Sequence, residues 1–174
     1  ETKDRAAHLR VELEAQLTSQ QVEVAQTRVQ AKSFETVVDE ILKQAFQQAD
    51  KESKNVFVIF HASWCILCRK LDGSMNDAAC KNLFNDNYVI RHLVIYESKG
   101  KENPGAVDLI TKYKGNDLGI PYWLVFDKEG KLLADSKIRP EGGSLDAGIN
   151  IGCPSSKKEV TYFLSILRKT SKLD

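Results

Sequence analysis

The sequence lacks two features that would decide its class at once, a long hydrophobic run and an excess of one charge. No apolar stretch approaches the ~18 residues that a membrane-spanning helix needs, and the N-terminus lacks the apolar core of a signal peptide. The 25 Lys and Arg are interleaved with 24 Asp and Glu. We therefore expect no nucleic-acid partner, because phosphate binding requires a basic stripe. The first residue is Glu1 rather than Met, which is compatible with a removed targeting segment or membrane anchor.

The length and composition fit one folded domain with an N-terminal extension. A hydrophobic fraction of 42% and a charged fraction of 28% are ordinary for a globular protein and exclude a disordered or collagen-like chain. Splitting 174 residues in two would leave both halves small, so we expect one domain over residues 33–174. Residues 1–32 are charged and Gln-rich, with Leu9, Leu13 and Leu17 spaced four apart. This pattern predicts a helical or partly ordered arm.

The first part of the domain alternates helical and β-prone patterns. Residues 33–49 carry apolar side chains at helical spacing and predict an amphipathic helix. The continuous run Val56–Phe60 predicts a strand buried on both faces, as parallel sheets contain. Residues 88–96 predict a second strand, and residues 106–113 a short helix. The resulting β-α-β-α order indicates an α/β fold with a central mixed sheet.

The other segments contain a hairpin, a long loop and a final helix. The helix after the first strand should kink near Gly73 or Asn76. Residues 122–135 resemble an antiparallel hairpin, and the Gly-, Pro- and Ser-rich residues 137–155 predict a long surface loop. Ser156-Lys157-Lys158-Glu159 is a capping-box pattern that starts the last helix. Its expected buried face consists of Val160, Phe163, Leu164 and Leu167.

The segment Trp64-Cys65-Ile66-Leu67-Cys68 carries the chemistry. Four cysteines produce a Cys-x-x-Cys spacing by chance in roughly 7 of 100 shuffled chains, and the preceding tryptophan reduces this to about one in a thousand. A helix N-terminus stabilises a thiolate through its unpaired N–H groups and partial positive charge. Cys65 is therefore the expected nucleophile, and Cys68, one turn later, the cysteine that resolves the mixed disulfide.

These residues resemble the thioredoxin superfamily, and more narrowly its exported thioredoxin-like domains with a Trp-Cys-x-x-Cys active site. The resemblance covers about residues 33–170 and includes Gly119-Ile120-Pro121-Tyr122-Trp123. It implies a thioredoxin fold with an N-terminal helical extension, a cis-proline at Pro121, and Ile120 as the residue whose backbone pairs with substrate. It also implies dithiol–disulfide exchange on protein substrates with no metal or organic cofactor, an upstream electron donor or acceptor protein, and a periplasmic or other extracytoplasmic location.

Two departures from the family pattern bear on the chemistry. Thioredoxins carry a buried acid six positions before the first cysteine, and this chain has Ile59 there. Glu97 is a candidate substitute, with a plain surface glutamate as the alternative. The dipeptide Ile66-Leu67 brings no cation to the Cys65 thiolate, which favours a reductase over an oxidase. Two nearby cations, Arg69 and Lys70, would either stabilise the thiolate or form a solvated helix face.

The other cysteines and histidines have plainer alternatives. Cys80 and Cys153 are either small buried side chains or a structural disulfide, which would require Cα atoms within ~7 Å and would imply an oxidising compartment. His61 ends the first strand near Trp64, where it would tune the site or pack as a strand residue. Only one close cysteine pair is present, so we expect no structural zinc.

The hypothesis from sequence is a thiol–disulfide oxidoreductase that acts through Cys65 and Cys68, with Trp64 and Pro121 forming a shallow apolar platform for extended peptides. One alternative is a redox-inert thioredoxin-fold module that binds proteins. Another is a disulfide oxidase or isomerase. A cytoplasmic location stays open beside the extracytoplasmic one.

Overall fold

The computed structural model describes residues 37–171 except 99, 141 and 145. The chain divides into two compact units, residues 1–36 and residues 37–174. The predicted arm over residues 1–32 and the first residues of the predicted helix over 33–49 therefore lie outside the described residues. Among the helices that are described, none has both the length and the hydropathy to span a membrane.

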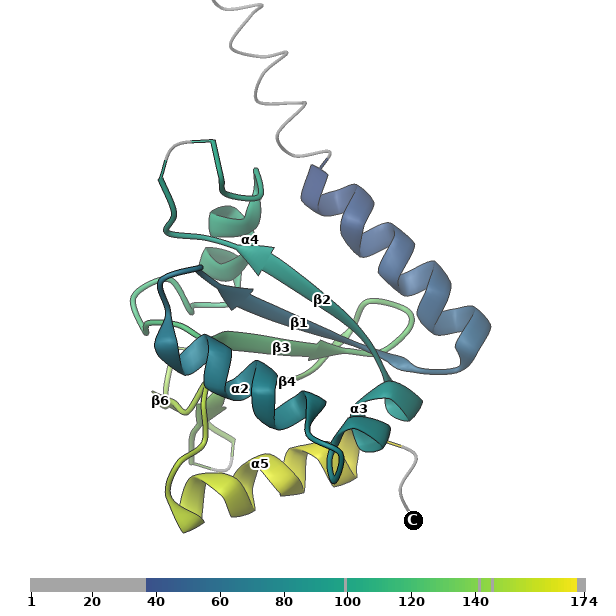
Figure 1. The fold of residues 1–174 in the computed structure, drawn as a ribbon, viewed down its shortest axis with the longest axis vertical. Helices are drawn as coiled ribbons and strands as arrows, with labels where there is room; N and C mark the ends of the chain where they lie inside the picture. Colours follow the sequence, from purple (N-terminus) through teal and green to yellow (C-terminus); the bar gives the residue numbers. More distant parts are fainter. Residues whose placement is uncertain (1–36, 99, 141, 145, 172–174) are drawn as a thin grey trace, which may run out of the picture. The chain divides into compact units, whose positions relative to one another are not determined.

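The described unit is built on a four-stranded mixed sheet (Figure 1). Its strands are β1 (Asn55–His61), β2 (Tyr88–Val94), β3 (Tyr122–Phe126) and β4 (Leu132–Asp135), in the spatial order β2-β1-β3-β4. β1 and β2 are parallel, whereas β3 runs antiparallel to both β1 and β4. The α/β class, the mixed central sheet and the hairpin that the sequence predicts are confirmed.

Five helices cover the two faces of this sheet. Residues 37–52 and α4 (Ala106–Lys112) lie on one face, and α2 (Ile66–Asn76) and α5 (Lys157–Thr170) lie on the other, with α3 (Lys81–Asn87) following α2 (Figure 1). β2 follows α3 directly and runs parallel to β1.

The alternation of side chains along β1 divides the core into two layers. Val58 and Phe60 point into the cluster under residues 37–52 and α4, whereas Phe57 and Ile59 point into the cluster under α2 and α5. All four side chains are at most 2% exposed. Successive strand residues point to opposite faces, so a run that is apolar at every position requires cover on both faces. The two layers of helices provide that cover.

The chain after β1 differs from the predicted single kinked helix. α2 ends at Asn76, and α3 begins at Lys81 as a separate helix. The side chain of Asp77 accepts a hydrogen bond from the backbone N–H of Ala79 at 2.9 Å. Such a local side-chain bond competes with helix continuation, which explains a break where the sequence indicates only a kink. Gly73 lies inside α2.

The capping box at the last helix is present, and its buried face contains two of the four predicted residues, Phe163 and Leu167. The Ser156 hydroxyl accepts from the N–H of Glu159 at 3.2 Å, and the Glu159 carboxylate accepts from the N–H of Ser156 at 2.9 Å. Leu167 is buried, whereas Val160 is 41% and Leu164 43% exposed. Phe163 stacks against the ring of Phe84 and packs beside Trp123, and Tyr162 and Ile166 pack in place of Val160 and Leu164.

The predicted surface loop over residues 137–155 contains regular structure. β5 (Lys137–Ile138) and β6 (Ile149–Asn150) form a separate two-stranded antiparallel sheet. The register pairs Lys137 with Asn150. Two residues per strand give too short a pattern to be recognised in a sequence.

Candidate active site

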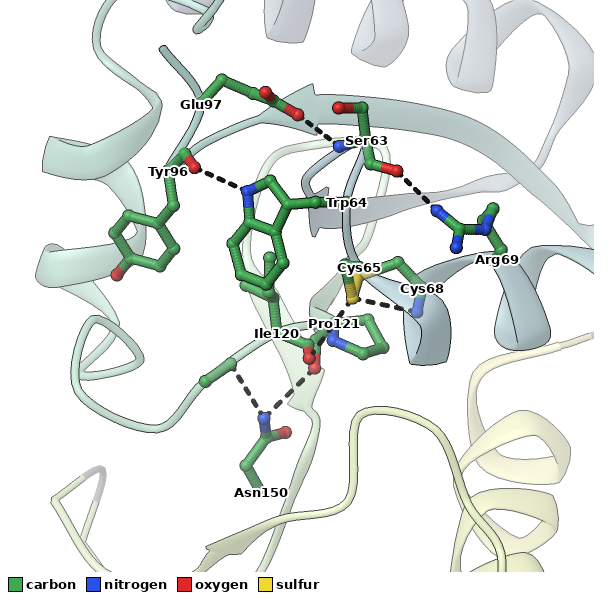
Figure 2. Close-up of a disulfide and its surroundings, with 11 residues drawn as sticks. Ser63, Trp64, Cys65, Cys68, Arg69, Tyr96, Glu97, Ile120, Pro121 and Asn150 are labelled. Carbon is green, nitrogen blue, oxygen red and sulfur yellow. Dashed lines mark hydrogen bonds between the residues drawn. A yellow bond between two sulfur atoms is a disulfide. The ribbon is translucent and has the colours of Figure 1, made fainter.

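Cys65 and Cys68 form a disulfide at the start of α2 (Figure 2). Cys65 is the N-cap residue of the helix, and its Sγ accepts a hydrogen bond from the backbone N–H of Cys68 at 3.0 Å. The two Cα atoms are 5.2 Å apart, which is ordinary disulfide geometry. The predicted pair therefore lies at a helix N-terminus, where one N–H already points at the first sulfur.

The disulfide lies beneath an exposed apolar surface. Cys65 is 4% and Cys68 6% exposed, and they pack with Ala62 and Ile120 in a small cluster of their own. The apolar side chains around them are open to solvent: Trp64 is 58%, Ile66 62% and Leu67 51% exposed. Exposed apolar groups that gather in one place commonly mark contact surfaces.

The segment around Pro121 reaches the disulfide from a distant part of the sequence. The Ile120–Pro121 peptide bond is cis, and the carbonyl oxygen of Ile120 lies 3.6 Å from the Sγ of Cys65. The next two residues, Tyr122 and Trp123, are fully buried in β3. β3 pairs with β1, the strand that precedes the cysteines. This pairing brings the two sequence motifs together.

Contacts from the segment after β2 fix the residues ahead of the disulfide. The indole Nε1 of Trp64 donates to the backbone carbonyl of Tyr96 at 2.9 Å, and the N–H of Ser63 donates to the Glu97 carboxylate (Figure 2). The hydrogen bond from Ser63 lowers the pKa of Glu97, which keeps this carboxylate ionised. Glu97 thus holds the backbone two residues before Cys65.

The two candidate cations make contacts of their own. The Arg69 guanidinium donates to the backbone carbonyl of Ser63 at 2.5 Å. The charge of Lys70 acts on Cys153, where it opposes the rise in pKa that burial causes in that thiol. At the Cys65 sulfur itself, the structure shows the helix N-terminus and a hydrogen bond from the N–H of Cys68.

A cavity of about 420 Å³ opens beside Cys68. Its walls include Arg69, Ile59, which is the residue at the position of the family's buried acid, and two histidines beside one carboxylate. These side chains are His61, Asp72 and His92. The rings of His61 and His92 meet edge to face with centroids 5.2 Å apart, and His92 Nε2 lies 3.7 Å from Asp72 Oδ1.

Burial lowers the pKa of both histidines below the usual value. The charge of His92 lowers the pKa of His61 further, whereas Asp72 opposes the shift at both rings. Sequence reasoning identified His61 and missed His92. The register pairs His92 with Ile59, so the alternation along β2 would have placed His92 on the face that α2 covers.

Cys80 and Cys153 are free thiols in the structure, so the bridge considered from the sequence is not formed in it. Both pack at the edge of the core layer between the sheet and α5, as small apolar side chains do. Over the described part of the chain, no group of three or more His, Cys, Asp or Glu side chains is placed to hold a metal ion.

Comparisons with known proteins agree with this geometry. Residues 38–128 match the family described as thioredoxin-like. A disulphide isomerase from Xylella fastidiosa Temecula1 has a similar solved structure, with 21% identity, a TM-score of 0.52, and coverage of 72% of this chain and 87% of that chain. The C-terminal domain of Neisseria meningitidis DsbD in the oxidised form matches at 18% identity and a TM-score of 0.45, over 73% of this chain and 94% of that chain. The first likeness supports the fold. No curated protein gives a significant match.

Proposed function

This chain belongs to the thioredoxin-like family, and on that premise we propose that it is a thiol–disulfide oxidoreductase that reduces disulfide bonds in protein substrates. One observation supports the proposal most directly. The Cys65–Cys68 disulfide lies at a helix N-terminus, and the Sγ of Cys65 is 3.6 Å from the carbonyl oxygen of Ile120. A redox pair and a backbone acceptor for an extended substrate thus occupy one site.

The proposed reaction uses both sulfurs in sequence. In the reduced protein, the Cys65 thiolate attacks one sulfur of a substrate disulfide, and the other substrate sulfur leaves as a thiolate and takes up a proton. The Cys68 thiol then loses its proton and attacks Cys65 Sγ. This step closes the Cys65–Cys68 disulfide and releases the second substrate thiol. Two electrons pass from the pair to the substrate, so the exchange requires no metal or organic cofactor.

The groups around Cys65 favour reduction over oxidation. A dithiol becomes a strong oxidant when its thiolate is unusually stable. Here the two side chains between the cysteines are apolar, and the Arg69 guanidinium is bound to the Ser63 carbonyl. The groups seen at the Cys65 sulfur are then the helix N-terminus and the N–H of Cys68. We expect these to stabilise the thiolate less than an added cation between the cysteines would, as in a reductant.

The surface around the disulfide supports protein segments as substrates. Trp64, Ile66 and Leu67 are each more than half exposed around two buried sulfurs. A substrate chain that pairs with the backbone of Ile120 would lay its apolar side chains on this surface, and burial of each large side chain is worth about 1.5–3 kcal/mol. Pro121, the next residue, would form part of the surface against which the paired substrate backbone lies.

A reductase of this kind requires a partner that reduces the pair after each cycle. We propose an upstream dithiol protein as that partner. We also propose that the protein works in the periplasm or another extracytoplasmic space, because protein disulfides form and persist there. Fractionation of native cells checks the location, and cytoplasmic protein would contradict it.

An insulin-reduction assay with dithiothreitol as the electron source tests the function. We expect wild-type protein to accelerate insulin precipitation and the Cys65→Ser variant to fall to the uncatalysed rate. Cys80→Ser is the matched control, because it makes the same substitution at a free cysteine outside the site, and it should keep wild-type activity. Equal background rates for wild type and Cys65→Ser would contradict the enzyme and support a redox-inert binding module.

The direction of electron flow has its own measurement. Equilibration of the Cys65/Cys68 pair with glutathione gives its reduction potential. A reductase should lie near the ~−270 mV of thioredoxin, whereas a value near the ~−120 mV of a strong bacterial oxidase would contradict the proposed direction.

A further inference from the structure

The side chain of Asn150 holds the backbone on both sides of Ile120. Its Nδ2 donates to the carbonyl oxygens of Leu118, Gly119 and Pro121, each at 3.1 Å. Figure 2 shows the Asn150 amide beside Pro121. An amide nitrogen has two hydrogens, so these are shared among three acceptors. The loop from Leu118 to Pro121 precedes β3 and belongs to no helix or strand. Its position therefore depends on side-chain contacts such as these.

The other end of the same amide fixes its orientation. Asn150 Oδ1 accepts from the Ser136 hydroxyl at 2.7 Å and from the N–H of Gly152 at 2.9 Å. With two donors on the oxygen and three acceptors on the nitrogen, only one orientation of the amide satisfies the network. The amide thus acts as a rigid bridge between β6 and the loop.

The two-stranded sheet of β5 and β6, which carries Asn150, also contacts the start of the connection that leads from α4 to Pro121. Lys137, the register partner of Asn150, donates from Nζ to the carbonyls of Tyr113 at 3.3 Å and Lys114 at 3.2 Å. Lys137 is fully buried. The paired residues of β5 and β6 therefore hold the two ends of the connection from α4 to Pro121. Both lie outside the stretch that matches the family, residues 38–128.

We propose that Asn150 is a positioning residue that sets the preference of this site for protein disulfides over small ones. The inference rests on the proposed function. An extended substrate must find the backbone of Ile120 at a fixed place beside Cys65, and Asn150 provides that placement through the carbonyls on either side. A small aromatic disulfide reaches the Cys65 sulfur without pairing to the backbone, so it does not depend on the loop.

The isosteric variant Asn150→Asp tests this separation. The carboxylate keeps the two acceptor contacts with Ser136 and Gly152, but it replaces the shared N–H donors by a negative charge that faces three carbonyl oxygens. Asn150→Ala removes both halves of the amide and leaves the carbonyls to water. The loss of protein-disulfide activity should therefore be larger for Asp than for Ala.

Asn103→Asp is the matched control. Its Oδ1 accepts from the N–H of Val94 at 2.7 Å, a contact that an aspartate retains, and the substitution adds the same charge. All proteins in this experiment, including the reference called wild type, carry Cys80→Ala and Cys153→Ala, so that only the active-site pair reacts with thiol reagents. Circular dichroism and the urea midpoint of each variant confirm that it is folded at the assay temperature.

Two rates are measured on each folded variant: kcat/KM for insulin reduction, and the second-order rate constant of the reduced pair with 5,5′-dithiobis(2-nitrobenzoate). For Asn150→Asp we expect insulin kcat/KM to fall at least about fivefold, through a higher KM, because about fivefold is the typical effect of losing one hydrogen bond. The rate with the small disulfide should stay within about twofold. Asn103→Asp should match wild type in both rates.

The possible results separate the two proposals. Wild-type protein that reacts with the small disulfide but never reduces insulin contradicts the proposed function and this inference with it. Wild-type protein active on both substrates, together with Asn150 variants that lose both rates equally or lose neither, overturns the inference about Asn150 alone. A selective loss on insulin supports it.

Discussion

Replacing Gly152 by alanine should destabilise the protein by disturbing the backbone at Pro121. A Cβ on Gly152 would lie 1.6 Å from the carbonyl oxygen of Pro121 and 2.7 Å from its carbonyl carbon. Ordinary contacts begin at 3.4 Å, so one of the two backbones must move by more than about 1 Å. Such overpacking costs about 1–3 kcal/mol.

The same movement would break a buried hydrogen bond. The indole Nε1 of Trp123 donates to the Gly152 carbonyl at 3.2 Å, and Trp123 is fully buried. An indole N–H left without a partner costs a further 1–3 kcal/mol or so. Together these effects give an expected destabilisation of about 2–6 kcal/mol. With a urea m-value of about 1–3 kcal/mol/M, the unfolding midpoint should fall by roughly 1 M or more.

Gly73 provides a control in which the same substitution should have the opposite effect. It is exposed inside α2, and a Cβ there would have no neighbour within 4 Å. Alanine at an exposed helix interior stabilises by about 0.5–1 kcal/mol relative to glycine. Urea titrations of wild type, Gly152→Ala and Gly73→Ala, followed by tryptophan fluorescence, measure all three. Equal midpoints for Gly152→Ala and wild type would refute the close approach of this segment to Pro121.

Three further outcomes follow from the core, the histidine pair and the last helix. Phe57→Ala should lower the free energy of unfolding by about 3–5 kcal/mol, because Phe57 is fully buried against four aromatic rings; calorimetry that shows under 1 kcal/mol would contradict this packing. In an NMR titration, His61 and His92 should have pKa values below the ordinary ~6.5, because burial disfavours their protonation. As the pH falls, the histidines of the unfolded chain take up protons before those of the folded chain, so the free energy of unfolding should fall below about pH 6.5. His92→Gln should raise the pKa of His61, because it removes the charge of His92. Measured pKa values above ~6.5 at both rings would disprove the assignment. Hydrogen bonds from the Ser156 and neighbouring backbone lower the pKa of Glu159 to about 2, so its contribution is present above the unfolded value of ~4.3 and lost as the pH falls toward 2. The difference in unfolding midpoint between wild type and Glu159→Gln should therefore shrink over that range, and a constant difference would speak against the capping contact.

Several elements could be predicted because their signals are local. The buried strand is encoded by five consecutive apolar residues, Val56–Phe60, and the last helix by Ser156 and Glu159, three positions apart. The redox pair is likewise encoded by the spacing of Cys65 and Cys68 behind a tryptophan. In each case the physical cause acts within one turn of helix or one strand, so the sequence carries it in full.

Other features could not be predicted because they depend on contacts between distant segments. Two exposed residues of the last helix, Val160 and Leu164, were mistaken for part of its buried face, because Tyr162 and Ile166 pack beside Phe163 and Leu167 instead. Glu97 was considered as a substitute acid, but in the structure it accepts from the N–H of Ser63. Helical periodicity alone does not identify the partner that a face will meet.

The sequence by itself therefore determined the α/β order of elements, the Cys65–Cys68 pair at a helix start, and the resemblance that points to Pro121. Only the tertiary structure decided which residues surround that pair. Ile120 reaches Cys65 across 55 positions through strand pairing, and Asn150 reaches the Pro121 carbonyl across 29. These contacts between distant residues follow from sheet register and loop closure. Both depend on the packing of the whole domain and leave no pattern in any short stretch of sequence.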